Sequence, residues 1–328
     1  MLKGLFLLKA FNDFFADTNY DSYTEKTARQ VFSTGIIYVG DCNFHISSSA
    51  SKGGSIYCVS SSTMKIVVEL CMFYKCSGSE GGAMYIKNTA SLSVAQNKNC
   101  ANQCATSDLE YQFAYVSVSS SGINHANYLS VVYCSRNIAK YNTMQLVGGE
   151  QRLNNCNISA TYIRSKTGLT TQSSTSFKLS YSSITNTYGA NIYTIYVING
   201  NNNLVKNCNI VNNSLGNVAT AVGGVVHQEI GSTVFYSCVF LINALKGKKH
   251  LISCDSGTIS LSYCYYDSLT YTLTAPSIGG TPISSKTHII DFFASYHCDK
   301  PYTVPIVITS HLAYPKKIRY FILTLINE

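Results

Sequence analysis

The chain has 328 residues, of which 46% are apolar and only 12% are charged. The apolar share is enough for a buried core, but the charged share is about half that of an ordinary soluble domain. Ser, Thr, Asn and 25 tyrosines fill the gap. This mixture favours β-strands and turns over helices, because β-branched and aromatic side chains suit a pleated surface. The net charge is +8, but the sequence contains no run of five like-charged residues, which argues against a nucleic-acid-binding arm.

Residues 1–32 form an N-terminal segment that differs from the rest of the chain. Leu5, Leu8, Phe11 and Phe15 lie on one face of a helix if this segment is helical. We therefore expect a short amphipathic helix that caps the open end of a repeat array, since terminal repeats need caps. The alternative is a remnant targeting sequence, although no clear cleavage site follows the apolar run. No apolar run reaches 18 residues, so the sequence predicts no transmembrane span.

Residues 33–275 contain a repeat whose copies begin 22 to 34 residues apart. Each copy starts with a small anchor residue, and an apolar residue stands two positions later in most copies. In a strand these two residues share a face. The anchors are Cys42, Cys71, Cys100, Cys134, Cys156, Ser182 (where serine replaces cysteine), Cys208, Cys238 and Cys264. The residues two positions later are Phe44, Phe73, Asn102, Arg136, Ile158, Ile184, Ile210, Phe240 and Tyr266. The third and fourth copies fit worst, and Cys104 is an alternative anchor for the third.

Glycine pairs mark a second element of the repeat. Gly53-Gly54 precedes the apolar segment SIYCV, Gly81-Gly82 precedes AMYIK and Gly223-Gly224 precedes VVHQE. Gly148-Gly149 stands in a matching place but leads into the polar segment EQRL. A glycine pair readily adopts a positive φ. We therefore predict a corner at each pair, followed by the start of a strand.

These repeats predict an all-β fold, a right-handed parallel β-helix of about nine coils over residues 33–275, of the pectin-lyase-like type. Propeller blades need longer repeats, and leucine-rich repeats need a regular leucine lattice that is missing here. Successive coils stack at about 4.8 Å, so the anchor cysteines would form an inward-facing ladder. Their parallel Cβ vectors disfavour disulfides. We expect a mainly reduced ladder, with residues 276–328 as a C-terminal cap or tail.

The motifs resemble a known family. GGSIY at Gly53, GGAMY at Gly81 and FLIN at Phe240–Asn243 are similar to the GGA(I/L/V) and FxxN repeats of the polymorphic membrane proteins, which include chlamydial autotransporter adhesins and surface proteins of trichomonad protists. FYKC at Phe73 departs from FxxN in its last residue. The resemblance covers roughly residues 36–270. It implies a surface-exposed β-helical protein used in adhesion, and hence a location at the cell surface or outside the cell, although no clear signal peptide is present.

Many β-helices degrade polysaccharides, so an enzyme is the main alternative. Glycoside hydrolysis ordinarily needs two carboxylates that flank the bond, yet only Glu150 and Glu229 lie between Tyr111 and Cys254. Asp108 with Glu110, and Asp255 with Asp267, are the acidic pairs that could meet. A pectin-lyase-like enzyme, whether polysaccharide lyase or glycosidase, predicts three or more carboxylates in one groove.

The sequence favours a protein that binds rather than catalyses. It has no nucleophile elbow, no phosphate-binding loop and no short metal-ligand spacing, so we predict no catalytic residue, cofactor or metal. The expected partner is a protein or glycan, with no specific nucleic acid. Arg136, Arg152 and Arg164 could line one face as candidate polyanion contacts, with Lys140, Lys166 and Lys178 as further candidates.

Overall fold

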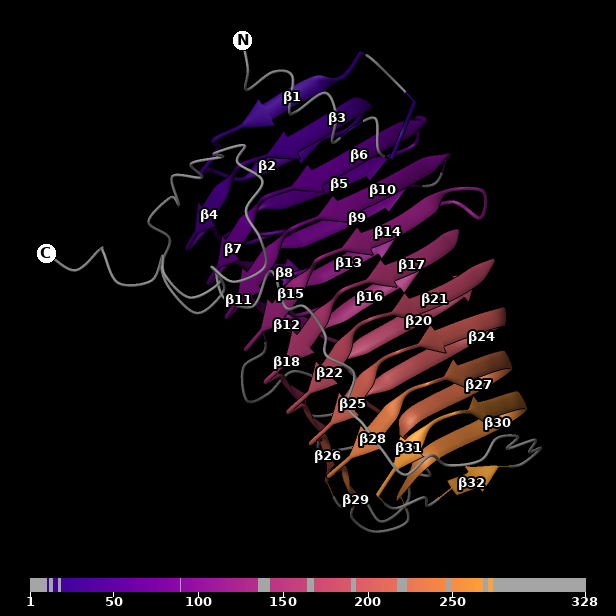
Figure 1. Ribbon diagram of the computed structural model, residues 1–328. Coiled ribbons are helices and arrows are strands. Elements are labelled where there is room, and N and C mark those ends of the chain that lie inside the picture. The colour runs from indigo at the N-terminus through magenta and orange to yellow at the C-terminus, as the bar shows by residue number, and fades with distance from the viewer. Residues whose placement is uncertain are drawn as a thin grey trace, which may run out of the picture.

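The computed structural model describes residues 11, 14–16, 19–88, 90–134, 142–163, 168–189, 193–216, 223–245, 249–267 and 271–273. Over this part of the chain the fold is an all-β solenoid of the right-handed parallel type. Figure 1 shows the strands stacked from β1 (Asp21–Thr24) at one end to β32 (Tyr271–Leu273) at the other. All pairings between strands in the described part are parallel, as expected when each coil repeats the path of the one before. The predicted tail, residues 276–328, lies outside the described residues.

Each full coil contributes three principal strands, and the stacked strands make three walls around the core. The first wall contains β2 (Gln30–Phe32), β5 (Ile56–Ser60), β9 (Met84–Asn88), β13 (Ala114–Ser117), β16 (Met144–Val147), β20 (Leu169–Ser174), the first halves of β24 (Ile195–Lys206), β27 (Gly223–Tyr236) and β30 (Lys249–Ser262), and β32. The second wall contains β1, β3 (Gly35–Gly40), β6 (Met64–Glu69), β10 (Leu92–Asn97), β14 (Ile123–Asn127), β17 (Glu150–Asn154), β21 (Ser176–Ser180) and the second halves of β24, β27 and β30.

The third wall is a ladder of nine short strands. Its members are β4 (Asn43–His45), β7 (Met72–Tyr74), β11 (Cys100–Asn102), β15 (Ser130–Val132), β18 (Asn157–Ser159), β22 (Ser183–Thr185), β25 (Asn209–Val211), β28 (Val239–Leu241) and β31 (Tyr265–Tyr266). Shorter strands follow it in several coils: β8 (Ser77–Glu80), β12 (Ala105–Glu110), β19 (Tyr162–Ile163), β23 (Tyr188–Gly189), β26 (Ser214–Leu215) and β29 (Ala244–Leu245). The walls enclose one continuous apolar core.

Strand register places the anchors of the repeat just before the third wall. Successive positions of this ladder are Cys42, Cys71, Asn99, Leu129, Cys156, Ser182, Cys208, Cys238 and Cys264. Cys100 and Cys134 do not belong to it. Cys100 lies one residue later, stacked between Met72 and Ser130 on the face opposite Ala101. The residues that fill the core in these two coils are therefore Ala101 and Val131, not Asn102 and Arg136.

Cys134 belongs instead to a second ladder, which follows the third wall. Its members are Ser47, Cys76, Cys104, Cys134, Thr161, Thr187, Asn213 and Asn243. Asn243 shows what this position does, because its Nδ2 donates to the Ile210 carbonyl at 2.8 Å and its Oδ1 accepts from the Asn213 amide at 3.0 Å. The FxxN motif is thus a core residue, Phe240, followed three positions later by a side chain that links neighbouring coils.

The glycine pairs serve two different corners. Gly53 and Gly81 have φ values of 65° and 58°, and a Cβ on Gly82 would lie 2.2 Å from the Gln112 carbonyl oxygen, so these pairs turn the chain into β5 and β9. Gly148-Gly149 turns the chain between β16 and β17 instead, at the following corner of the coil. Gly223 and Gly224 occupy the same register as Gly81 and Gly82, but they lie within β27, and Gly224 has no positive φ. The prediction of a corner is therefore wrong for this last pair.

The N-terminal segment lies along the side of the solenoid in its described part. Phe11 and Phe15 are buried against Tyr38, Val67 and Ala95, whose side chains point outward from β3, β6 and β10. The described part of this segment therefore covers the outer face of the second wall. The sequence had instead predicted a helix that closes the end of the repeat array. Residues 1–10, which carry most of the predicted helix, lie outside the described residues. The solenoid also begins within this segment, because β1 pairs with β3 and β2 pairs with β5.

Candidate functional site

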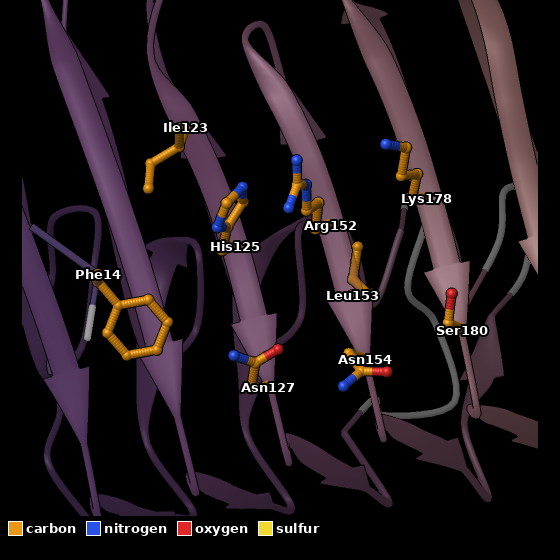
Figure 2. Close-up of a pocket in the computed structure, with 9 residues that line it drawn as sticks. All are labelled: Phe14, Ile123, His125, Asn127, Arg152, Leu153, Asn154, Lys178 and Ser180. Atoms are coloured by element: carbon orange, nitrogen blue, oxygen red, sulfur yellow. The ribbon is translucent and has the colours of Figure 1, made fainter. Parts of the chain in front are cut away.

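A groove of about 420 Å³ lies on the outer face of the second wall, beside the N-terminal segment. Its floor is formed by β14, β17 and β21, and Phe14 borders it on one side (Figure 2). Because alternate residues of a strand point outward, each strand contributes side chains to two parallel rows. The first row is His125, Arg152 and Lys178, and the second is Asn127, Asn154 and Ser180. Three successive coils thus repeat a nitrogen base or cation beside an amide or hydroxyl.

The first row is basic and partly desolvated. Arg152 donates from Nε to Glu150 Oε1 at 2.7 Å, and this pair lies within one strand. Lys178 forms no ion pair with any described residue. Burial and the neighbouring Arg152 lower the pKa of His125, and Glu150 opposes this shift. The Nε2 atom of His125 is buried and has no hydrogen-bond partner in the described part of the chain. The groove therefore offers the ammonium group of Lys178, which has no ion-pair partner among the described residues, beside the Arg152–Glu150 pair, while His125 Nε2 is enclosed 3.9 Å from Glu150 Oε2.

The basic character continues past the groove along the same wall. Lys206 follows Ser180 in register, and its ammonium group lies 5.4 Å from the ring centre of Tyr236 on the next coil. From β14 to β30, Glu150 is the one carboxylate among the outward-facing described residues of this wall. Three cations on successive coils therefore face a single carboxylate.

Only some of the residues predicted from the sequence meet here. Arg152 and Lys178 both line the groove. Arg136, Arg164, Lys140 and Lys166 lie outside the described residues. Sequence reasoning missed His125, Asn127, Asn154 and Ser180. The coils differ in length, so only strand register shows that these side chains align, and no motif in the sequence marks them.

A second polar cluster lies on the outer face of the first wall, near the C-terminal end of the solenoid. His227 Nδ1 lies 2.8 Å from Ser253 Oγ, and its Nε2 lies 3.4 Å from Asp255 Oδ2. The ring of Tyr193 stacks on the His227 imidazole at 4.0 Å. Burial lowers the pKa of His227, with Asp255 and Glu229 opposing the shift. This cluster joins a neutral imidazole to two carboxylates on neighbouring coils.

Two tyrosines, Tyr193 and Tyr196, pack against the second polar cluster. The hydroxyl of Tyr196 donates to Glu229 Oε2. Burial raises the pKa of Tyr193 to about 12, with the nearby carboxylates adding to the effect. Both phenols therefore stay neutral at physiological pH. Ser253 is only 1% exposed, so its hydroxyl is placed to hold the imidazole rather than to meet a substrate.

The acidic pairs expected from the sequence are not the ones that converge. Asp255 meets His227, whereas Asp267 accepts a hydrogen bond at 2.6 Å from the Ile242 amide, beside the third wall. Asp108 and Glu110 lie on β12, where Glu110 pairs in register with Glu80. The carboxylates that approach one another through His227 are Glu229 and Asp255. Two carboxylates gather there, fewer than the three that the enzyme hypothesis predicts.

The described residues include no group of three or more His, Cys, Asp or Glu side chains arranged to hold a metal ion. Within the same ranges, no helix has the length and apolar character needed to cross a bilayer. Comparison of the chain with protein-family models, with curated proteins and with solved structures finds no match in any of the three.

Proposed function

We propose that this chain is a non-catalytic β-helical protein of the surface or adhesion type, which binds a host, glycan or protein partner along the outer face of its second wall. One observation carries the proposal: three neighbouring coils place His125, Arg152 and Lys178 in one row beside a row of amide and hydroxyl groups. A groove of about 420 Å³ is within the usual size range for ligand sites. The resemblance of the GGA and FxxN motifs to polymorphic membrane proteins supports the same role.

Adhesion of coated beads tests this proposal. Ser180→Trp fills the groove from an outward-facing position and leaves the core untouched, whereas Ser117→Trp adds the same bulk on the outer face of the first wall. Beads coated with the wild-type chain or with Ser117→Trp should adhere to host-cell monolayers, and Ser180→Trp beads should lose most of this adhesion. Equal adhesion of both variants would refute a role of the groove. If antibodies stain the protein only after permeabilisation, and not on live, unpermeabilised cells, surface display is refuted.

A carbohydrate-active enzyme is the second candidate, and the cluster of His227, Glu229 and Asp255 is the observation that favours it. In such an enzyme the two carboxylates would serve as the acid and base that flank a glycosidic bond. Incubation of the wild-type chain with a panel of polysaccharides should then release new reducing ends or unsaturated uronates. Glu229→Gln and Asp255→Asn should each abolish this release. No release from any polysaccharide of the panel would remove the candidate.

A further inference from the structure

Building on the proposed function, we infer that the groove takes an acidic glycan, a linear chain of uronate or sulfated sugars that runs along the solenoid axis across β14, β17, β21 and β24. The axis is the direction in which the chemistry repeats. Arg152, Lys178 and Lys206 stand on three successive coils, while Asn127, Asn154 and Ser180 supply hydrogen-bonding groups beside them. A polymer aligned with the axis would meet Arg152 and Lys178 in the first row on two successive coils, and then Lys206, which continues the second row on the next coil.

The charges on this face select for an anion. Lys178 has no ion-pair partner among the described residues, and Arg152 shares only Glu150. His125 lies beside this pair, with its Nε2 3.9 Å from Glu150 Oε2. Guanidinium and ammonium groups bind carboxylate and sulfate by charge-assisted hydrogen bonds. Arg152, Lys178 and Lys206 would therefore hold anionic groups spaced at one or two coils, and β14 to β24 spans roughly 14 Å at about 4.8 Å per coil.

The polar row selects for a glycan over other polyanions. Amide and hydroxyl side chains match the hydroxyl groups that a sugar chain carries on every residue. A single-stranded nucleic acid would instead need aromatic faces on which its bases stack. The lining residues of the groove include only two rings, Phe14, which packs against the N-terminal cluster, and the partly buried His125. A folded acidic protein would not fit a groove of about 420 Å³.

Fluorescence anisotropy with short labelled oligomers tests the inference directly. The probes are oligogalacturonate, a heparin oligosaccharide, neutral maltohexaose and single-stranded oligothymidylate. We expect both acidic oligosaccharides to bind, with log Kd rising against log salt at a slope of roughly 2 to 3, because about three cations are neutralised. Arg152→Gln, Lys178→Gln and Lys206→Gln should each weaken binding about tenfold, since each removes a charge-assisted contact. Lys87→Gln, an exposed cation on the first wall, is the matched control and should bind like the wild type.

The outcomes separate this inference from the proposed function. Equal binding of maltohexaose and the acidic oligomers would overturn the requirement for charge, and stronger binding of oligothymidylate would overturn the choice of a glycan. Unchanged binding by Arg152→Gln, Lys178→Gln and Lys206→Gln would overturn the location. If no oligomer binds while wild-type beads still adhere and Ser180→Trp beads do not, the acidic glycan is refuted and the groove remains the binding site. Melting temperatures equal to the wild type show that the variants fold.

Discussion

At the scale of single residues, the corners of the coils are the strained part of this fold. The residue before each anchor and the residue before each second-ladder position adopt the left-handed conformation, with φ between 47° and 56° in most coils. Many of them are bulky, including Leu70, Tyr181 and the β-branched Ile46 and Ile242. Their side chains are largely exposed, so no packing compensates for the conformation. A non-glycine residue pays about 1–2 kcal/mol for this geometry.

Ile242 is the clearest place to relieve that strain. It has a φ of 54° and is 66% exposed, so an asparagine, which tolerates this conformation, loses little packing there. We expect Ile242→Asn to raise the free energy of unfolding by about 0.5–1 kcal/mol, measured by urea denaturation. Val59→Asn replaces a 42% exposed apolar side chain on β5, at a position without a positive φ. This variant should not raise the free energy of unfolding. An equal increase in both variants would mean that replacing an exposed apolar side chain, rather than relieving the backbone conformation, causes the effect.

The side chain of Asn213, in the second ladder, forms hydrogen bonds with the backbone of the preceding coil. It is fully buried; its Nδ2 donates to the Ile184 carbonyl at 2.9 Å, and its Oδ1 accepts from the Thr187 amide at 3.0 Å. Alanine at this position would leave a buried amide and a buried carbonyl without these partners. We expect Asn213→Ala to lower the free energy of unfolding by about 2–4 kcal/mol. Asn157→Ala, on the outward side of β18, should cost less than about 1 kcal/mol, and a similar loss at both positions would contradict the bridging role.

At the scale of the element, most positions of the anchor ladder hold a small side chain that hydrogen-bonds to the backbone of a neighbouring coil, and Leu129 is an apolar exception. Cys208 Sγ donates to the Leu179 carbonyl at 3.5 Å and Cys238 Sγ to the Val205 carbonyl at 3.3 Å, each on the preceding coil. Asn99 Nδ2 makes the equivalent bond to the Val68 carbonyl at 2.8 Å. Ser182 accepts from the Cys156 amide at 3.0 Å. Serine and asparagine therefore replace cysteine without breaking the ladder.

This inward placement predicts inert thiols. Burial raises the pKa of Cys58 and Cys156 to about 12, and both are free and buried. At pH 8 a thiol of that pKa is ionised only about one time in ten thousand, and the thiolate is the reactive form. Iodoacetamide followed by peptide mass spectrometry should label both cysteines at least roughly a hundredfold more slowly in the native protein than in urea. Rapid native labelling of Cys156 would mean that its sulfur does not point into the core.

The period of the repeat was predictable because the corner chemistry recurs in most coils, but the register of two coils was not. Cys134 misled the alignment because a thiol suits either corner ladder. Cys100 misled it because this residue, which is disulfide-bonded, stands one position beyond the true anchor. The register is set by Ala101 and Val131, small core residues that no pattern distinguishes from their neighbours. Arg152 could be predicted as a candidate from its charge alone. Its alignment with His125 and Lys178 could not be predicted, because it depends on the register of the paired strands.

At the scale of the whole molecule, the outer face of the second wall changes character along the axis. At the N-terminal end it is apolar, and Phe11 and Phe15 cover it. The groove follows, and beyond Lys206 the wall exposes Val234 and Tyr236. The N-terminal segment thus covers the apolar part of this face near the N-terminal end and leaves the basic part exposed. Phe14, which borders both, makes the segment part of the groove as well as a cover.

One buried and two partly buried histidines on two walls link the stability of the whole solenoid to pH. Burial lowers the pKa of His125, His227 and His250 from an ordinary value of 6.5. Between that value and their folded pKa the unfolded chain binds more protons than the native one, so stability is full above about pH 6.5 and falls as the pH drops below it.

Urea denaturation of the wild type at pH 7.5 and pH 5.5 measures this loss. His227 is the most deeply buried of the three histidines, so His227→Gln should remove a large share of the difference in unfolding free energy between the two pH values. His45, which is exposed and stacks on Tyr74 at 5.0 Å, provides the matched control. His45→Gln should leave the difference intact. If the wild type is equally stable at both pH values, or if both variants behave alike, the imidazole of His227 is not held neutral by the packing of the first wall.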